Sequence, residues 1–226
     1  MNVINSAIIL AAGIGSRFNS NYPKCLHRLP NGNTILGNQI LHLKRNGVKQ
    51  IIVVVGFKKE MIMEAYPDIF FHYNPEFRST NTSKSLMRAF KNLLPGNYIW
   101  INGDVYLDDN VIRKIIMAKG NTVCVNNSIC GDEEVKYCCN SDGFITEISK
   151  DVKNGEGEAV GVNKICYEDF ERFVLALEEC EQNDYFEKAI EISIDAGLLF
   201  TSVNVSDCSC IEVDFKSDME RVNELF

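Results

Sequence analysis

The chain lacks the features that mark several common classes of protein. Of its 226 residues only three are histidines, His27, His42 and His72, and their spacing does not match a zinc site. No apolar run is long enough to span a membrane, and no N-terminal stretch joins basic residues to an apolar segment as a signal peptide does. We therefore expect a cytoplasmic protein with no membrane partner.

Positive charge and close cysteine pairs are scarce as well. Lys and Arg number 23 against 31 Asp and Glu, and this net charge of −8 argues against nucleic acid, which is bound by clustered cations. The nine cysteines include no Cys-x-x-Cys pair, which favours reduced, structural thiols over a metal or redox site. The motif Gly-x-Gly-x-x-Gly is missing too, so a dinucleotide-dependent dehydrogenase is not indicated.

Strands and helices alternate through the first half of the chain. The β-branched run at 50–56 is too apolar for a strand with one exposed face, so it predicts a buried parallel strand. The segment 34–46 has helical apolar spacing, a cationic last turn and Gly47 as a stop signal. Together with a strand at 7–10, these segments form a βαβ unit. Further helices are expected at 58–66 and 84–94, and further strands at 70–73 and 98–104.

After residue 121 the crossover helices stop and short β segments follow. Segments at 122–126, 134–138 and 144–149 are typical of a small mixed or antiparallel extension that closes over a substrate. An apolar face on this extension would support a homodimer. Ser217 is the expected N-cap of the last helix, with Glu220 three residues later in a capping-box pattern. The other expected elements are strands at 158–165, 201–205 and 208–215 and helices at 167–181, 184–196 and 216–226.

The most informative segment is A-I-I-L-A-A-G-I-G-S-R at 7–17, followed by Pro23-Lys24. A short apolar run broken by Ala-Ala-Gly predicts a buried parallel strand, and open α/β sheets bind ligands at the C-terminal ends of such strands. Small residues let backbone N–H groups approach an anion, while Arg17 offers a planar fork and Lys24 a point charge. The segment therefore predicts a phosphate-binding loop, and an ordinary tight turn with solvated cations is the alternative.

The pattern L-x-A-A-G-x-G-x-R, then P-K, resembles the signature of the nucleotidyltransferases that join a nucleoside triphosphate to a phosphorylated small molecule. This family comprises nucleotide-sugar pyrophosphorylases and cytidylyltransferases. The resemblance implies an α/β fold, with a Rossmann-like, mostly parallel sheet flanked by helices, as in glycosyltransferase-A-like nucleotidyltransferases, and a small mixed β extension. It implies a single domain over 1–226, whose nucleotide-binding half covers about 1–120 and whose acceptor-binding half covers about 121–226. Only five residues, 18–22, separate Arg17 from Pro23, where many sugar-phosphate members carry a longer insert.

Two further segments supply carboxylates. Asp104 follows Gly103 at the end of an expected strand, where a helix cap or turn residue is the ordinary interpretation. In Ile211-Glu212-Val213-Asp214 the two acids lie on one face of the expected strand. A face that simply points to solvent would explain this alternation equally well. The family resemblance implies a Gly-Asp after the fourth strand and a second metal-binding Asp near the C-terminus. It therefore assigns Asp104 and Asp214 as ligands of Mg²⁺, which prefers carboxylate and phosphate oxygens.

Other matches to the family are looser. The segment N-T-S-K-S-L at 81–86 is a polar helix cap by itself, and it resembles an Asn-rich motif that lies beside the nucleotide. The segment from Gly157 resembles a Gly-Glu-x-x-Gly strand that borders the acceptor pocket, and ordinary surface charges are the alternative. The implied acceptor-binding residues are Lys150, Glu158 and Glu212, of which the two acids suit a positive amine. The implied nucleotide-binding residues are Leu10, Ala11, Ala12, Gly13, Gly15, Ser16, Arg17, Lys24, Asn81, Thr82, Ser85 and Gly103.

The resemblance implies a CTP-dependent cytidylyltransferase with Mg²⁺ as its cofactor. Its partners would be CTP, or another nucleoside triphosphate, and a small phosphorylated or phosphonylated acceptor such as phosphocholine, aminoethylphosphonate or glutamine phosphate. The implied catalytic residues are Arg17, Lys24, Asp104 and Asp214. Two alternatives remain open: a sugar-1-phosphate nucleotidyltransferase that uses UTP or GTP, and a non-catalytic, nucleotide-binding regulatory protein.

Overall fold

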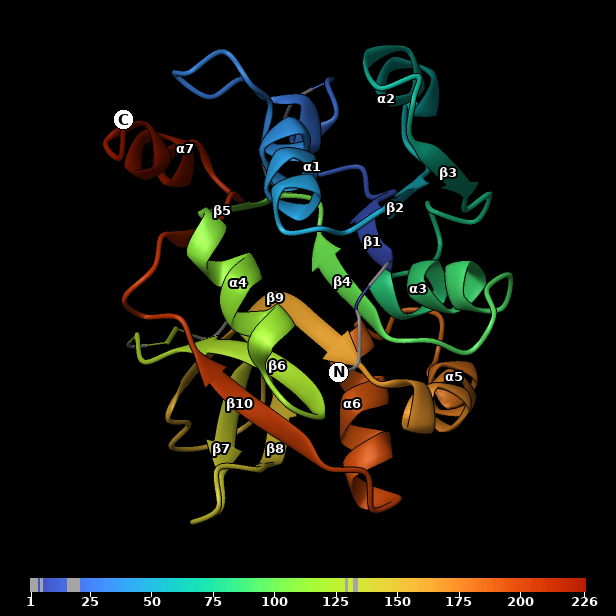
Figure 1. The fold of residues 1–226 in the computed structure, drawn as a ribbon, viewed down its shortest axis with the longest axis vertical. Coiled ribbons are helices and arrows are strands. Elements are labelled where there is room, and N and C mark those ends of the chain that lie inside the picture. Colours follow the sequence, from blue (N-terminus) through green and yellow to red (C-terminus); the bar gives the residue numbers. More distant parts are fainter. Residues whose placement is uncertain (1–3, 5, 16–20, 129, 132–133) are drawn as a thin grey trace.

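A computed structural model describes residues 4, 6–15, 21–128, 130–131 and 134–226 of the chain. A central sheet lies between two layers of helices (Figure 1). The strands are β1 (Ser6–Ala11), β2 (Gln50–Val55), β3 (Phe70–Tyr73), β4 (Tyr98–Asn102), β5 (Val105–Leu107), β6 (Asn121–Asn126), β7 (Lys136–Cys139), β8 (Ile145–Ser149), β9 (Gly157–Ile165), β10 (Phe200–Asn204) and β11 (Cys210–Glu212). The α-helices are α1 (Ile35–Arg45), α2 (Lys59–Ala65), α3 (Thr82–Phe90), α4 (Asp109–Met117), α5 (Phe170–Glu179), α6 (Phe186–Asp195) and α7 (Lys216–Asn223), and the short 3-10 helices are η2 (Lys24–Leu26) and η3 (Tyr167–Asp169). A separate two-stranded ladder, β5 with β11, begins just after the central strand β4.

The main sheet has the order β10-β6-β9-β4-β1-β2-β3. Strand β1 lies at its centre and pairs in parallel with β2 and β4, so Leu10 faces Val54 on one side and Asn102 on the other. In this order β9 is the only strand that runs antiparallel to its neighbours, β4 and β6. The predicted α/β class with a mostly parallel sheet is therefore confirmed.

Each face of the sheet is covered by its own helices. Helices α1 and α4 lie on one face over an aliphatic core, and Figure 1 shows both in front of the sheet. Helices α3, α5 and α6 cover the other face, where the core is aromatic and Trp100 stacks on Phe173 with ring centroids 5.0 Å apart. Because both faces are covered, the central strands are apolar throughout, as the sequence predicts.

Helix boundaries follow their capping residues. Helix α1 matches the expected segment: Thr34 Oγ1 accepts a hydrogen bond from Gly37 N, and Gly47 ends the turn with a φ of +84°. Helix α3 begins at Thr82, two residues before the expected start, because the side chain of Asn81 accepts a hydrogen bond from Thr82 N. The helix therefore begins directly after the capping residue Asn81.

The segment between β4 and β6 holds an element that the sequence reasoning does not assign. After β5, the carboxylate of Asp108 accepts hydrogen bonds from Asn110 N and Val111 N and starts α4. The spacing of Val111, Ile112 and Ile115, all fully buried, is helical. An Asp followed by this apolar spacing is the signal that would have predicted the helix.

The expected β extension is present in part. Strands β7 and β8 form an antiparallel pair beside β9, at the lower end of Figure 1. The segment expected as its first strand is instead β6, which belongs to the main sheet between β9 and β10. All nine cysteines are free thiols, as expected. Among the residues that the structure describes, no helix combines the length and apolar character that a membrane crossing needs.

The C-terminal segment differs from the sequence-based expectation in two ways. The strand expected at 208–215 is only three residues long, and β11 pairs antiparallel with β5 instead of joining the main sheet. Ser217 is not the N-cap of α7: the cap is Phe215, and the carboxylate of Asp218 accepts hydrogen bonds from Phe215 N and Asp214 N. An acid in the first turn takes this role because it reaches the free N–H groups ahead of the helix.

Candidate active site

A cavity of about 620 Å³ opens where β1 and β4 end. This volume is in the range of small-molecule sites, and its place at the carboxyl ends of parallel strands is where α/β sheets bind ligands. Residues from both halves of the chain line it, from Leu10 in β1 to Arg221 in α7.

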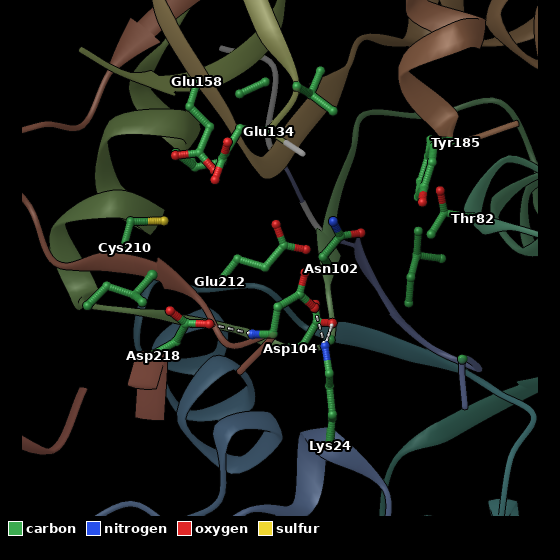
Figure 2. Close-up of a pocket in the computed structure, with 18 of the residues that line it drawn as sticks. Lys24, Thr82, Asn102, Asp104, Glu134, Glu158, Tyr185, Cys210, Glu212 and Asp218 are labelled. Atoms are coloured by element: carbon green, nitrogen blue, oxygen red, sulfur yellow. Dashed lines mark hydrogen bonds and ion pairs between the residues drawn. The ribbon is translucent and has the colours of Figure 1, made fainter. Parts of the chain in front are cut away.

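Three carboxylates from distant parts of the chain meet in this cavity. Asp104, Glu212 and Asp214 each offer an oxygen, and the three oxygens lie within 4.8 Å of one another. The ladder of β5 and β11 brings them together, because it continues into a hydrogen bond from Val213 N to the carbonyl of Asp104. Asp214 N donates to Asp218, as Figure 2 shows, which fixes the backbone that carries the third carboxylate.

Lys24 points into this group of carboxylates. Its Nζ lies 2.9 Å from Asp104 Oδ2 and 2.5 Å from Asp214 Oδ1, and Figure 2 shows it rising from η2 below them. Burial alone would lower the pKa of Lys24, but the charges of Asp104 and the hydrogen bonds to both aspartates outweigh it, so the pKa lies above 10.5. Lys24 is therefore a cation wherever the protein is folded near neutral pH.

Glu212 completes the acidic group. Enclosure by protein, followed by the charges of Asp104 and Asp214, raises the pKa of the Glu212 carboxyl well above 4.5. Its side chain nevertheless lines the cavity and is accessible to solvent, so repulsion by the two aspartates is the main cause of this rise in pKa. A cation brought into the cavity would relieve this repulsion.

The donor set fits a hard divalent cation. Carboxylate oxygens from three residues within 4.8 Å match the ligand preference of Mg²⁺, which usually binds few protein carboxylates beside substrate phosphates. Asp104 and Asp214, predicted as ligands, belong to this set, and Glu212, predicted as an acceptor-binding residue, joins them.

The glycine-containing loop forms another wall of the cavity. Leu10, Ala11, Gly13 and Gly15 line it, whereas Ala12 is buried and its carbonyl accepts a hydrogen bond from Phe57 N. Gly15 has a φ of +66°, and a Cβ there would come within 2.9 Å of the Lys24 side chain. Ser16 and Arg17 lie outside the described residues.

Gly103 holds the end of β4 against β1. A Cβ at this position would come within 2.7 Å of the carbonyl oxygen of Leu10 and 3.0 Å of Ala11 Cβ. Only glycine allows this approach, and the approach sets the position of Asp104 beside the loop.

The start of α3 forms a further wall. Asn81 and Thr82 line the cavity, and both are tied to the chain around the start of α6: Asn81 Nδ2 donates to Asn183 O, and Phe186 N donates to Thr82 Oγ1. Ser85, predicted with them, is not among the lining residues. It is buried behind them, where its Oγ accepts a hydrogen bond from Asn74 Nδ2.

The predicted acceptor residues Lys150 and Glu158 lie on opposite sides of the cavity. The Lys150 Nζ lies 4.9 Å from the centre of the Tyr185 ring, whereas Figure 2 shows Glu158 across the cavity, close to Glu134 and above Cys210. Burial, opposed by a hydrogen bond from Asn126 and reinforced by the charge of Glu134, raises the pKa of Glu158.

The predicted site omits several residues that line the cavity, among them Glu134, Tyr185 and Glu187. Glu134 Oε2 is buried and has no hydrogen-bond partner among the described residues. Glu187 is only 7% exposed, and burial raises its pKa to about 7 against the opposing effects of its own N–H group and Lys150. Glu187 lies next to the apolar positions of an expected helix, and this was the signal in the sequence that could have indicated a buried acid.

Comparisons with known proteins identify relatives of the chain. The family model of the MobA-like NTP transferase domain matches residues 7–160. CMP-5'-(3-aminopropyl)phosphonate synthase from Streptomyces rubellomurinus is 28% identical over 97% of this chain and 38% of its own length. The bifunctional protein GlmU from Caldanaerobacter subterraneus is 28% identical over 84% of this chain and 45% of its own length.

The chain thus spans less than half the length of these two curated relatives. Among solved structures, CTP:phosphocholine cytidylyltransferase from Streptococcus pneumoniae is similar with a TM-score of 0.83, over 98% of this chain and 99% of that one. Because the two sequences are only 23% identical, this likeness shows a shared fold.

Proposed function

The chain belongs to the MobA-like NTP transferase family of nucleotidyltransferases, and from this we propose that it is a CTP-dependent cytidylyltransferase. It would join CMP to a small phosphorylated or phosphonylated head group and release pyrophosphate. The observation that carries the proposal is the group of Lys24, Asp104 and Asp214 in a cavity bordered by the glycine-containing loop. We also propose one domain, with the nucleotide beside the loop and the acceptor beside β9.

The proposed reaction is an in-line attack by an acceptor phosphate or phosphonate oxygen on the α-phosphorus of CTP, with pyrophosphate as the leaving group. The attacking oxygen is already ionised at neutral pH, so no side chain has to remove a proton. Lys24, together with the predicted contribution of Arg17, would neutralise phosphate charge and hold the reacting groups in line.

Asp104 and Asp214, with Glu212 beside them, would hold the metal ion of this reaction. Bound Mg²⁺ supplies further neutralisation of charge on the phosphates. The protein's own contribution is the ladder of β5 and β11, which sets the carboxylates before a ligand arrives.

The acceptor end of the cavity favours a head group with a positive charge. Glu134 and Glu158 lie close together there, and Glu134 Oε2 has no hydrogen-bond partner among the described residues. An ammonium group would pair with both carboxylates and relieve their repulsion. The names of the relatives support this assignment, since aminopropylphosphonate and phosphocholine each carry a cationic amine.

The test is pyrophosphate release with Mg²⁺, each of the four ribonucleoside triphosphates and a panel of acceptors. The panel holds aminoethylphosphonate, phosphocholine, glutamine phosphate, phosphoserine, glycerol phosphate and hexose 1-phosphates. We expect release with CTP and an amine-bearing head group. Release only with UTP or GTP and a hexose 1-phosphate would move the protein to the sugar branch, and binding of triphosphate without release on any acceptor would favour a regulatory protein.

A pair of variants ties this activity to the cavity. Asp104→Asn should lower turnover about a hundredfold or more, because one carboxylate of the metal-binding group is lost. Asp142→Asn makes the same chemical change in an exposed turn and should leave turnover unchanged. Equal activity of the two folded variants would contradict the assigned role of Asp104.

A further inference from the structure

The ammonium group of Lys24 occupies the space between two carboxylates of the metal-binding group. It lies 2.9 Å from an oxygen of Asp104 and 2.5 Å from an oxygen of Asp214. Only 10% of the lysine side chain is exposed, against 26% of each aspartate side chain. Lys24 therefore serves here as a cation that belongs to the chain itself.

The fold holds Lys24 in this place from its base. The lysine is the first residue of η2, directly after Pro23, and its stem runs beside Gly15, where a Cβ would come within 2.9 Å of Lys24 Cγ. The two aspartates are fixed without the lysine: the hydrogen bond from Val213 N to Asp104 O joins their segments, and that from Asp214 N to Asp218 anchors Asp214. The contact thus joins the start of η2 to the end of the β5–β11 ladder.

An ammonium group and a hard divalent cation compete for the same kind of ligand. Both are compact charges that bind carboxylate oxygens, and the lysine ammonium is a strongly hydrated point charge on a flexible stem. While Lys24 contacts Asp104 and Asp214, one oxygen of each is turned to the lysine. Phosphate oxygens are the one class of ligand in the proposed reaction that would offer Lys24 an alternative partner.

We propose that Lys24 is an internal cation that keeps Asp104 and Asp214 closed to a free divalent ion, and that nucleotide phosphates open this pair by drawing the lysine away. The inference rests on the proposed function, because it assumes that the cavity takes a nucleoside triphosphate. Its consequence is an order of events: the metal site forms together with the bound nucleotide and not before it.

Binding of Mn²⁺ without nucleotide, measured from the EPR signal of the free ion, tests the proposal. We expect Lys24→Met to bind Mn²⁺ about tenfold or more tightly than the wild type, because the competing charge is removed. Lys150→Met is the matched control, since it removes a lysine that lines the same cavity and that lies over Tyr185. Its Mn²⁺ affinity should stay within about twofold of the wild type.

Equal Mn²⁺ affinity of wild type and Lys24→Met would overturn the proposal. So would an equal gain in both methionine variants, because the cause would then be the general charge of the cavity. Thermal unfolding checks that each variant is folded, and Lys24→Gln, expected to gain affinity in the same direction, replaces Lys24→Met if that variant does not fold.

A second measurement on the wild-type protein separates displacement of the lysine from coexistence with the metal. The rate at which an amine-reactive reagent acylates Lys24, followed by peptide mass spectrometry, should rise several-fold when Mn²⁺ alone is added at saturation, because the ammonium has left its carboxylates. An unchanged rate under saturating Mn²⁺ would refute displacement. Neither measurement uses turnover, so the outcome is independent of whether CTP or another nucleotide supports pyrophosphate release.

Discussion

Replacement of Glu187 by glutamine should stabilise the folded protein at neutral and alkaline pH but not in acid. Glu187 lies in the first turn of α6, only 7% exposed, on the wall of the cavity. Burial raises its pKa from 4.5 to about 7, although its own N–H group and Lys150 act in the opposite direction. The folded protein therefore holds a proton on this carboxyl over a pH range in which the unfolded chain releases it.

The sign of the effect follows from this difference in proton binding. For a carboxyl whose pKa is higher in the folded state, stability is lost as pH rises from the unfolded pKa through the folded one. Between pH 4.5 and about pH 7, this carboxyl lowers the free energy of unfolding by at most about 3 kcal/mol. The value is an upper limit, because water drawn to the ionised side chain makes the loss smaller. Glutamine has nearly the same shape and no proton to release, so Glu187→Gln avoids this loss.

The assay is thermal unfolding of both proteins across this pH range. Below about pH 4 the two melting temperatures should differ little, and near about pH 8 Glu187→Gln should melt higher, by at most roughly 6–12 °C for a domain of this size. Glu191→Gln, on the same helix but partly exposed in contact with Lys188, is the matched control and should show no such gain. A gain that is independent of pH, or that appears only in acid, would refute the reasoning.

Four further predictions concern residues that line the cavity. Gly103→Ala should lower the free energy of unfolding by about 2 kcal/mol, and the melting temperature by roughly 4–8 °C, because its Cβ would meet the neighbouring strand. Gly13→Ala, whose Cβ meets nothing within 4 Å, should leave the melting temperature unchanged and raise the KM for the proposed triphosphate substrate. Asp218→Ala should lower turnover about 10–100-fold by releasing the backbone of Asp214, which steady-state kinetics will show. Asn81→Ala removes the cap of α3 and should cost about 1 kcal/mol in a denaturant titration.

Local signals predicted the part of the fold that surrounds the glycine-containing loop. The strand before the loop, the helix capped by Thr34 and the buried run of β2 each carry their information in a short segment: apolar periodicity, a capping hydroxyl and a glycine stop. Such signals act within a turn or two of the residues that form them. The corresponding elements therefore match the expectation closely.

The meeting of Asp104 with Asp214 has a different basis. Spacing alone left each aspartate with an ordinary interpretation, and a family resemblance assigned both to the metal. In the structure a short ladder between β5 and β11 brings them together. Val105, Tyr106 and Ile211 favour strands, but neither segment carries a local signal for its partner, and the two pair because the chain around them is already packed.

Glu134 and Glu187 show where prediction from sequence reaches its limit. Each is one acid among 31 acidic residues, in a chain with a net charge of −8. What distinguishes them is burial beside the cavity, which depends on helices and strands far away in sequence. A pocket side chain of this kind has no local pattern, because its position is set by packing and not by its neighbours.

The charge of the cavity places a condition on its ligands. Seven carboxyl groups and three cationic side chains line its described part, so a triphosphate meets a surplus of charge of its own sign. Repulsion of this kind is strong inside a protein, where the effective dielectric constant is well below that of water. The pKa values of Glu158, Glu187 and Glu212 are raised, which lessens the surplus, but the other four carboxyl groups still outnumber the three cations. A divalent cation that enters with the nucleotide and an ammonium group on the acceptor would each supply the missing positive charge. The same acidic surplus thus favours a metal-bound nucleotide and an amine-bearing acceptor over a sugar phosphate, which has no positive group to offset its own negative charge.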